Sequence, residues 1–157
     1  MGVSETRAPA RQARRSRWAY YRRVFAAYAL GGGSHLTFWH GTPQVNEEAR
    51  VDSVGQYYMP FLRKAAYRGP YDQYGIPLLD YRGNVGQQYN PIAIAQYGLG
   101  NYNLWKRSGE ENGKLGFLRV ARWLVEHLEP NPWGIPVWNH HFDWEYRDVL
   151  KAPWYSG

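Results

Sequence analysis

One stretch of the sequence decides the fold: YNPIAIAQYGLGNY, residues 89–102. Asn90 is a good helix N-cap, and Pro91 at the first helical position gives up an N–H that would have no partner there. Apolar residues then recur at helical spacing, and Gly98 with Gly100 leaves room for close approach by a neighbouring element. This pattern predicts an amphipathic helix that begins after Asn90 and ends near Lys106.

The polar residues of this predicted helix are unusual beside an apolar stripe. Gln96, Tyr97, Asn101 and Tyr102 carry hydrogen-bonding groups, as expected of a helix that lines a hydrated pocket. The alternative is a helix–helix contact in which buried polar groups satisfy one another. The sequence leaves both interpretations open.

Charge separates the N-terminus from the rest of the chain. The 157 residues carry a net charge of +6, but residues 1–25 hold seven of the basic residues and one acid, which leaves twelve of each elsewhere. We interpret residues 1–12 as a basic flexible tail and predict a single domain over residues 13–157. A basic arm is also suited to nucleic acid or an acidic glycan, but the neutral body argues against a nucleic-acid-binding protein.

Composition narrows the class of protein further. The chain has no cysteine, which excludes a disulfide framework and a thiolate zinc site. No apolar run approaches the roughly 20 residues that span a bilayer, and no hydrophobic signal core follows the N-terminal arginines. We therefore expect a cytoplasmic protein with no membrane partner.

Aromatic residues are abundant and divided by type. Nine of the fourteen tyrosines lie between residues 57 and 102, whereas six of the eight tryptophans come later. Such rings are suited to stacking on sugars or bases, because each has an apolar body and the tyrosines and tryptophans also have a polar tip. The alternative is a core filled with large aromatics, and composition does not separate the two.

The remaining elements follow from the spacing of apolar residues. A helix over residues 14–30 places Trp18, Tyr21, Phe25 and Tyr28 on one face, and a second covers residues 114–128. We predict a loop at residues 108–113, a hairpin of residues 76–81 with 85–89, a strand at 54–59, and a strand at 133–138 paired with 142–146. The fold class is mainly α with β-hairpins.

Several segments resemble one family in the same order along the chain. They are YNPIAIAQYGL (residues 89–99) preceded by GIPL (75–78), then RWLV (122–125), WGIPV (133–137) and APWYSG (152–157). Together these residues are similar to the D-glucuronyl C5-epimerase family, over about residues 55–157. The family converts glucuronate to iduronate in heparan-type chains.

The resemblance implies a fold, a partner and an incomplete chain. It implies an α/α toroid of paired helices entered through β-hairpins, acting on an acidic polysaccharide. We expect no cofactor and no metal in the reaction, although family members can carry a structural calcium. Family members continue past the APWYSG segment into later helices that hold a tyrosine and glutamate cluster. We therefore expect this chain to be the N-terminal part of an incomplete helical barrel, completed by a C-terminal helical part or by homo-oligomerisation.

The chemistry of C5 epimerisation suggests which residues to examine. A proton α to a carboxylate is removed and returned on the opposite face, so the carboxylate charge must be stabilised and acid/base groups must flank the ring. A tyrosine can serve if a nearby cation, such as Arg68 or Arg82, lowers its pKa from about 10. We predict Tyr71 and Tyr74 as catalytic hydroxyls in a Pro/Gly-bounded loop. The predicted substrate-binding residues are Arg63, Tyr89, Gln96, Tyr97 and Asn101.

Other chemistries find less support in the sequence. The pairs His35 and His40, and His140 and His141, lack the helical spacing of a zinc site. Asp143, Glu145 and Asp148 could supply some of the oxygen ligands that calcium needs. The main alternative function is a non-catalytic carbohydrate-binding or interaction module, in which the aromatic rings stack on a glycan and no proton moves.

Overall fold

The computed structural model of the chain describes the following residues: 44–81, 84–145 and 149–155, with Trp18, Tyr21, Arg22, Phe25 and Ala29. The chain forms two compact units, residues 1–37 and 38–157. In the first unit the described residues are helical, as the helix predicted over residues 14–30 requires, and their aromatic side chains are exposed. Tyr28 lies outside the described residues, and the predicted boundary between tail and domain at residue 12 stays a prediction.

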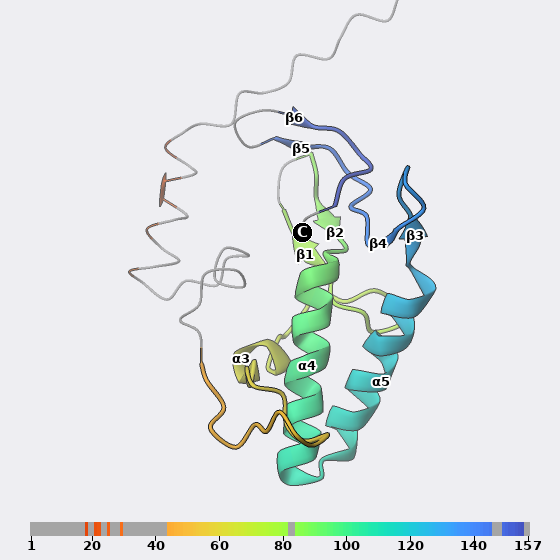
Figure 1. Cartoon of the computed structure of the whole chain (residues 1–157). Helices are drawn as coiled ribbons and strands as arrows, with labels where there is room; N and C mark the ends of the chain where they lie inside the picture. The colour runs from red at the N-terminus through yellow and green to blue at the C-terminus, as the bar shows by residue number, and fades with distance from the viewer. Residues whose placement is uncertain are drawn as a thin grey trace, which may run out of the picture. The chain divides into compact units, whose positions relative to one another are not determined.

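The second unit is built on two long helices, α4 (Pro91–Ser108) and α5 (Glu111–Glu126), which pack side by side and run in opposite directions (Figure 1). Gly109, with a φ of 73°, ends α4 in the left-handed conformation, so only Gly109 and Glu110 join the helices. The loop predicted at residues 108–113 is therefore wrong in extent.

Close packing of the two helices explains that difference. A Cβ at Gly113 would lie 2.9 Å from the backbone oxygen of Asn101, and one at Gly98 would lie 2.7 Å from Val120 Cγ1. These glycines let the helix surfaces approach to distances that a methyl group forbids. Gly113, which suggested a loop in the sequence, is thus a packing residue inside α5.

The start of α4 confirms the sequence prediction. The Asn90 side chain accepts a hydrogen bond from the Ala93 N–H at 2.9 Å, and Pro91 occupies the first turn. The Asn90 amide also donates to the Tyr81 hydroxyl at 2.6 Å, and Asn90 is buried. The cap therefore fastens the helix to the hairpin that precedes it.

On another side, α4 packs against the short helix α3 (Leu62–Ala65). A Cβ at Gly100 would lie 2.5 Å from the backbone oxygen of Phe61. The strand predicted at residues 54–59 is absent, because the buried Asn103 side chain pairs with this backbone instead: Asn103 accepts from the Tyr57 N–H at 2.6 Å and donates to the Met59 oxygen at 3.0 Å.

Three two-stranded antiparallel sheets complete the described part of the second unit. They pair β1 (Leu79–Asp80) with β2 (Gln87–Gln88), β3 (Glu129–Pro130) with β4 (Pro136–Val137), and β5 (Trp144–Glu145) with β6 (Val149–Leu150). The first hairpin confirms the prediction, with Leu79 opposite Gln88.

The predicted pairing of residues 133–138 with 142–146 is wrong. The Asn131 side chain accepts from the backbone N–H groups of Trp133 and Ile135, both at 3.0 Å, and closes a tight turn that folds the chain back onto Glu129. Residues 144–145 then pair with a later strand. The hydrogen bonds of the Asn131 side chain thus favour pairing of β3 with β4 over the predicted pairing.

Two apolar clusters form the core around α4. The first contains Ile76, Ile94, Tyr97, Val120 and Trp123, and the second contains Leu79, Tyr81, Ala93 and Phe142. The helices and hairpins agree with the predicted mixture of α-helix and β-hairpin. Within the part of the chain that the structure describes, no helix combines the length and the apolar character needed to cross a membrane.

Candidate functional site

The candidate site is built on a tight turn over residues 72–76. The Asp72 carboxylate accepts from the backbone N–H groups of Tyr74 at 2.9 Å and Ile76 at 2.8 Å. The backbone also closes on itself, because the Asp72 N–H donates to the Ile76 oxygen at 3.0 Å. Gly75 adopts a φ of 78°, which suits glycine in such a turn. This turn leaves the Tyr74 side chain 71% exposed.

The same carboxylate holds a tyrosine from another segment. The Tyr89 hydroxyl, just before the cap of α4, donates to Asp72 Oδ2 at 2.7 Å. Burial tends to raise the pKa of Asp72, but the hydrogen bonds from Ile76, Tyr89, Tyr74 and Gly75 outweigh it and lower that pKa. Burial, together with the hydrogen bond and the charge of Asp72, raises the pKa of Tyr89 to about 12. At neutral pH the pair is therefore a carboxylate and a neutral phenol.

Aromatic rings pack together beside this turn. The Tyr71 ring makes edge contacts with Tyr67 and Tyr97, with centroids 5.7 and 6.0 Å apart. The Tyr71 hydroxyl donates to the backbone oxygen of Tyr67, and the Tyr89 ring lies 5.2 Å from that of Trp123. Burial and neighbouring tyrosines raise the pKa of Tyr71, an effect that the charge of Arg119 partly opposes. The phenol of Tyr71 is thus protonated at neutral pH, where it is suited to hydrogen bonding and unsuited to removing a proton.

An arginine of α5, Arg119, lies against the same turn at Gly75. A Cβ added at Gly75 would be 2.5 Å from Arg119 Nη1 and 3.2 Å from Arg119 Cζ. Arg119 is itself exposed. The absence of a side chain at Gly75 therefore gives the guanidinium room beside the turn that bears Tyr74.

The structure brings together four of the seven residues predicted for the site. Tyr71, Tyr74, Tyr89 and Tyr97 gather at the Asp72 turn, although Tyr97 is only 9% exposed and belongs to the core. We name this group, with Asp72 and Arg119, the tyrosine surface. It is the part of the predicted site that has a common location.

The other three predicted residues lie elsewhere. Asn101 is buried between the helices, where its amide donates to the Tyr97 oxygen at 2.9 Å and its side chain faces Gly116. This is the helix–helix contact that the sequence left open as an alternative. Arg63 is exposed on α3, and Gln96 is partly buried on α4.

Sequence reasoning missed Asp72 and Arg119. Asp72 had a local signal, since an Asp shortly before a glycine is typical of a turn closed by its own side chain. Arg119 had none, because its contact with Gly75 joins two positions far apart in the chain. The cations proposed to act on a tyrosine were Arg63, Arg68 and Arg82; the first two are exposed, and Arg82 lies outside the described residues.

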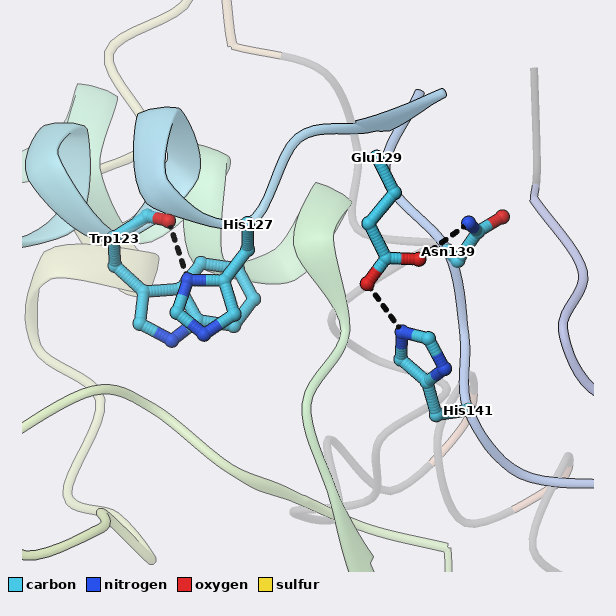
Figure 2. A network of polar contacts seen from close by, with 5 residues as sticks. All are labelled: Trp123, His127, Glu129, Asn139 and His141. Atoms are coloured by element: carbon cyan, nitrogen blue, oxygen red, sulfur yellow. Dashed lines mark hydrogen bonds and ion pairs between the residues drawn. The ribbon is translucent and has the colours of Figure 1, made fainter. Parts of the chain in front are cut away.

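A second polar network lies beyond the end of α5 (Figure 2). Glu129 on β3 accepts hydrogen bonds from two side chains that follow β4. These are the Asn139 amide at 2.8 Å and His141 Nε2 at 2.9 Å. The hydrogen bond from Asn139 and the nearby His141 lower the pKa of Glu129. At the end of α5, the ring of Trp123 stacks on that of His127, the residue after the helix, with centroids 4.1 Å apart. We name the contacts of Glu129 with Asn139 and His141 the Glu129 network.

Neighbouring histidine and acid side chains are engaged in the fold. His140 is buried against Trp154, with ring centroids 3.9 Å apart, and burial followed by the charge of His141 lowers the pKa of His140 to about 4. Asp143 pairs with Lys151 Nζ at 2.6 Å, whereas Asp148 lies outside the described residues. Within the described ranges, no group of three His, Cys, Asp or Glu residues is arranged to hold a metal ion.

Comparison of the chain with protein-family models, curated proteins and solved structures gave no match. The features of the chain that bear on function are therefore the tyrosine surface and the motifs in the sequence. The tyrosine surface combines exposed phenols, an engaged carboxylate and a cation, a set suited to binding a sugar acid through hydrogen bonds, ring contacts and charge.

Proposed function

We propose that this chain takes part in C5 epimerisation of glucuronate units in an acidic polysaccharide, as a uronate C5-epimerase with an α/α-toroid fold. The observation that carries the proposal is the gathering of Tyr71, Tyr74 and Tyr89 at the Asp72 turn. Tyr89 is the first residue of the segment 89–99 that carries the sequence resemblance, and Tyr71 and Tyr74 come shortly before the segment 75–78. The polysaccharide binds across this surface, with its sugar rings against the exposed phenols.

The tyrosine surface has a limited part in the chemistry. Burial raises the pKa of Tyr71, and burial with Asp72 raises that of Tyr89, so both phenols are protonated at neutral pH. Each O–H donates within the fold, Tyr71 to the Tyr67 oxygen and Tyr89 to Asp72, and must turn to the substrate to return a proton to C5 or to hold the carboxylate by a hydrogen bond. Removal of the C5 proton requires a base of lower pKa on the opposite face of the ring. The family that the motifs resemble carries a tyrosine and glutamate cluster in later helices, and such groups are suited to this role.

The test is isotope exchange with the product of the complete reading frame that contains these residues. After incubation with heparosan in D₂O, we expect deuterium at C5 and iduronate, both measured by NMR. Tyr71→Phe should lower the exchange rate by about tenfold or more, since a positioned acid contributes about 10²–10⁴-fold. Tyr58→Phe is the matched control, because Tyr58 is exposed elsewhere in the unit. Absence of both deuterium and iduronate overturns the proposed activity.

A non-catalytic carbohydrate-binding module is the second candidate. The observation that favours it is the raised pKa of Tyr71 and Tyr89, which suits hydrogen bonding better than proton removal. The two functions differ in one result. A binding module retains heparosan and leaves C5 free of deuterium, whereas an epimerase exchanges the C5 proton.

A further inference from the structure

The position of Arg119 is unusual for an exposed arginine. Its side chain extends from α5 against the turn of residues 72–76, where a single methyl group at Gly75 would collide with the guanidinium. Its charge also acts on the Tyr71 phenol. The guanidinium therefore lies at the edge of the tyrosine surface, next to the backbone of the turn.

Among the residues that the structure describes, no carboxylate pairs with Arg119. The described ion pairs are Lys114 with Glu111, His141 with Glu129, and Lys151 with Asp143. Asp72, the acid of the same turn, is engaged by backbone N–H groups and by the Tyr89 hydroxyl. A positive charge thus lies beside the phenols, and no ion pair within the described part of the chain engages it.

We infer that Arg119 binds the carboxylate of the uronate unit and makes the tyrosine surface selective for acidic over neutral sugars. This inference rests on the proposed function. A guanidinium presents paired N–H donors in a plane that matches a carboxylate, and it stays charged at every working pH. When a proton leaves C5, negative charge moves onto that same carboxylate, so a cation there also favours proton loss.

The structure separates Arg119 from Arg63, the arginine that the sequence suggested for this role. Arg63 lies on α3, which packs against α4 at Gly100, whereas α5 packs against α4 at Gly98 (Figure 1). Arg63 is exposed on its short helix. Of these two arginines, Arg119 lies against the turn that carries the exposed Tyr74, so we assign selectivity to Arg119.

The experiment compares binding of two probes by calorimetry with the full chain: a heparosan oligosaccharide and the same oligosaccharide with its uronate carboxyl groups reduced to alcohols. The unmodified protein should bind the carboxylated probe about tenfold more tightly or better, as expected for a charge-assisted hydrogen bond. Arg119→Met should remove this preference and leave binding of the reduced probe unchanged. Arg119→Lys, which retains charge without the paired donors, should give an intermediate preference.

Arg122→Met is the matched control, since Arg122 is also exposed on α5. It removes the same net charge and should leave the preference intact. Circular dichroism verifies that each variant is folded. If Arg119→Met retains the full preference, or if Arg122→Met loses as much, the inference is wrong and the proposed function stands. If the unmodified protein binds neither probe, the proposed function fails together with the inference.

Discussion

The tyrosine surface and the Glu129 network each depend on one carboxylate that joins separate segments. The two carboxylates differ in the groups from which they accept hydrogen bonds. Asp72 accepts from two backbone N–H groups and from the Tyr89 hydroxyl, and the surrounding rings belong to or cover the core. Among the described residues, Glu129 accepts from side chains alone, and the side chains of His141 and Glu129 are 63% and 43% exposed. Asp72 therefore fixes the backbone of the turn that presents the tyrosines, whereas Glu129 links exposed side chains on the two sides of the β3–β4 hairpin.

The largest effect should come from Asp72→Ala. The substitution removes the acceptor of the Tyr74, Ile76 and Tyr89 donors and should lower the free energy of unfolding by about 2 kcal/mol, as expected for several partly solvated bonds to a charged group. Urea unfolding measures this loss. Asp72→Asn retains an acceptor for the turn and should lose about half as much. A loss within error for Asp72→Ala would contradict the role given to this carboxylate.

A smaller effect is expected of Tyr89→Phe, which removes one hydrogen bond and keeps the ring against Trp123. The free energy of unfolding should fall by about 1 kcal/mol, measured in the same urea titration. Tyr58→Phe, at an exposed position, should change it little. If Tyr89→Phe costs as much as Asp72→Ala, the backbone bonds of the turn contribute nothing, and the contrast with Glu129 disappears.

Local chemistry made some parts of this structure predictable. The cap at Asn90, the proline that follows it and the close approach at Gly98 and Gly100 are all read from neighbouring residues, and the structure confirms them. The hairpin of β1 and β2 is confirmed for the same reason. Tyr71 and Tyr74 were predicted to lie in one loop ahead of this hairpin, and they do.

Other parts depended on contacts that no local pattern contains. Gly113 is inside α5 because of Asn101 on the opposite helix, and residues 54–59 avoid a strand because of the Asn103 side chain. Arg119 joins the tyrosine surface through Gly75, a contact fixed only by the packing of α5. Distant partners decided these positions, so sequence spacing alone could not assign them.

Acid titration should extend the comparison to pH. The folded pKa of Asp72 lies below that of an unfolded Asp, about 3.9. The unfolded chain therefore binds the proton first, so the stability from Asp72 is present above that value and is lost as pH falls through the folded pKa. The difference in unfolding free energy between the unmodified protein and Asp72→Asn should shrink between about pH 5 and pH 2. A constant difference would mean that the charge of Asp72 contributes nothing.

The smallest effect is expected of Glu129→Ala. The pKa of Glu129 is also lowered, first by the Asn139 amide, but exposed pairs are screened by water and salt, so the free energy of unfolding should fall by less than about 1 kcal/mol. A double-mutant cycle with His141→Ala should give a coupling of about 0.2–1 kcal/mol that declines in high salt. A loss equal to that of Asp72→Ala would contradict this difference between the two carboxylates. The two carboxylates would then be equivalent, and side-chain contacts alone would suffice to shape a surface.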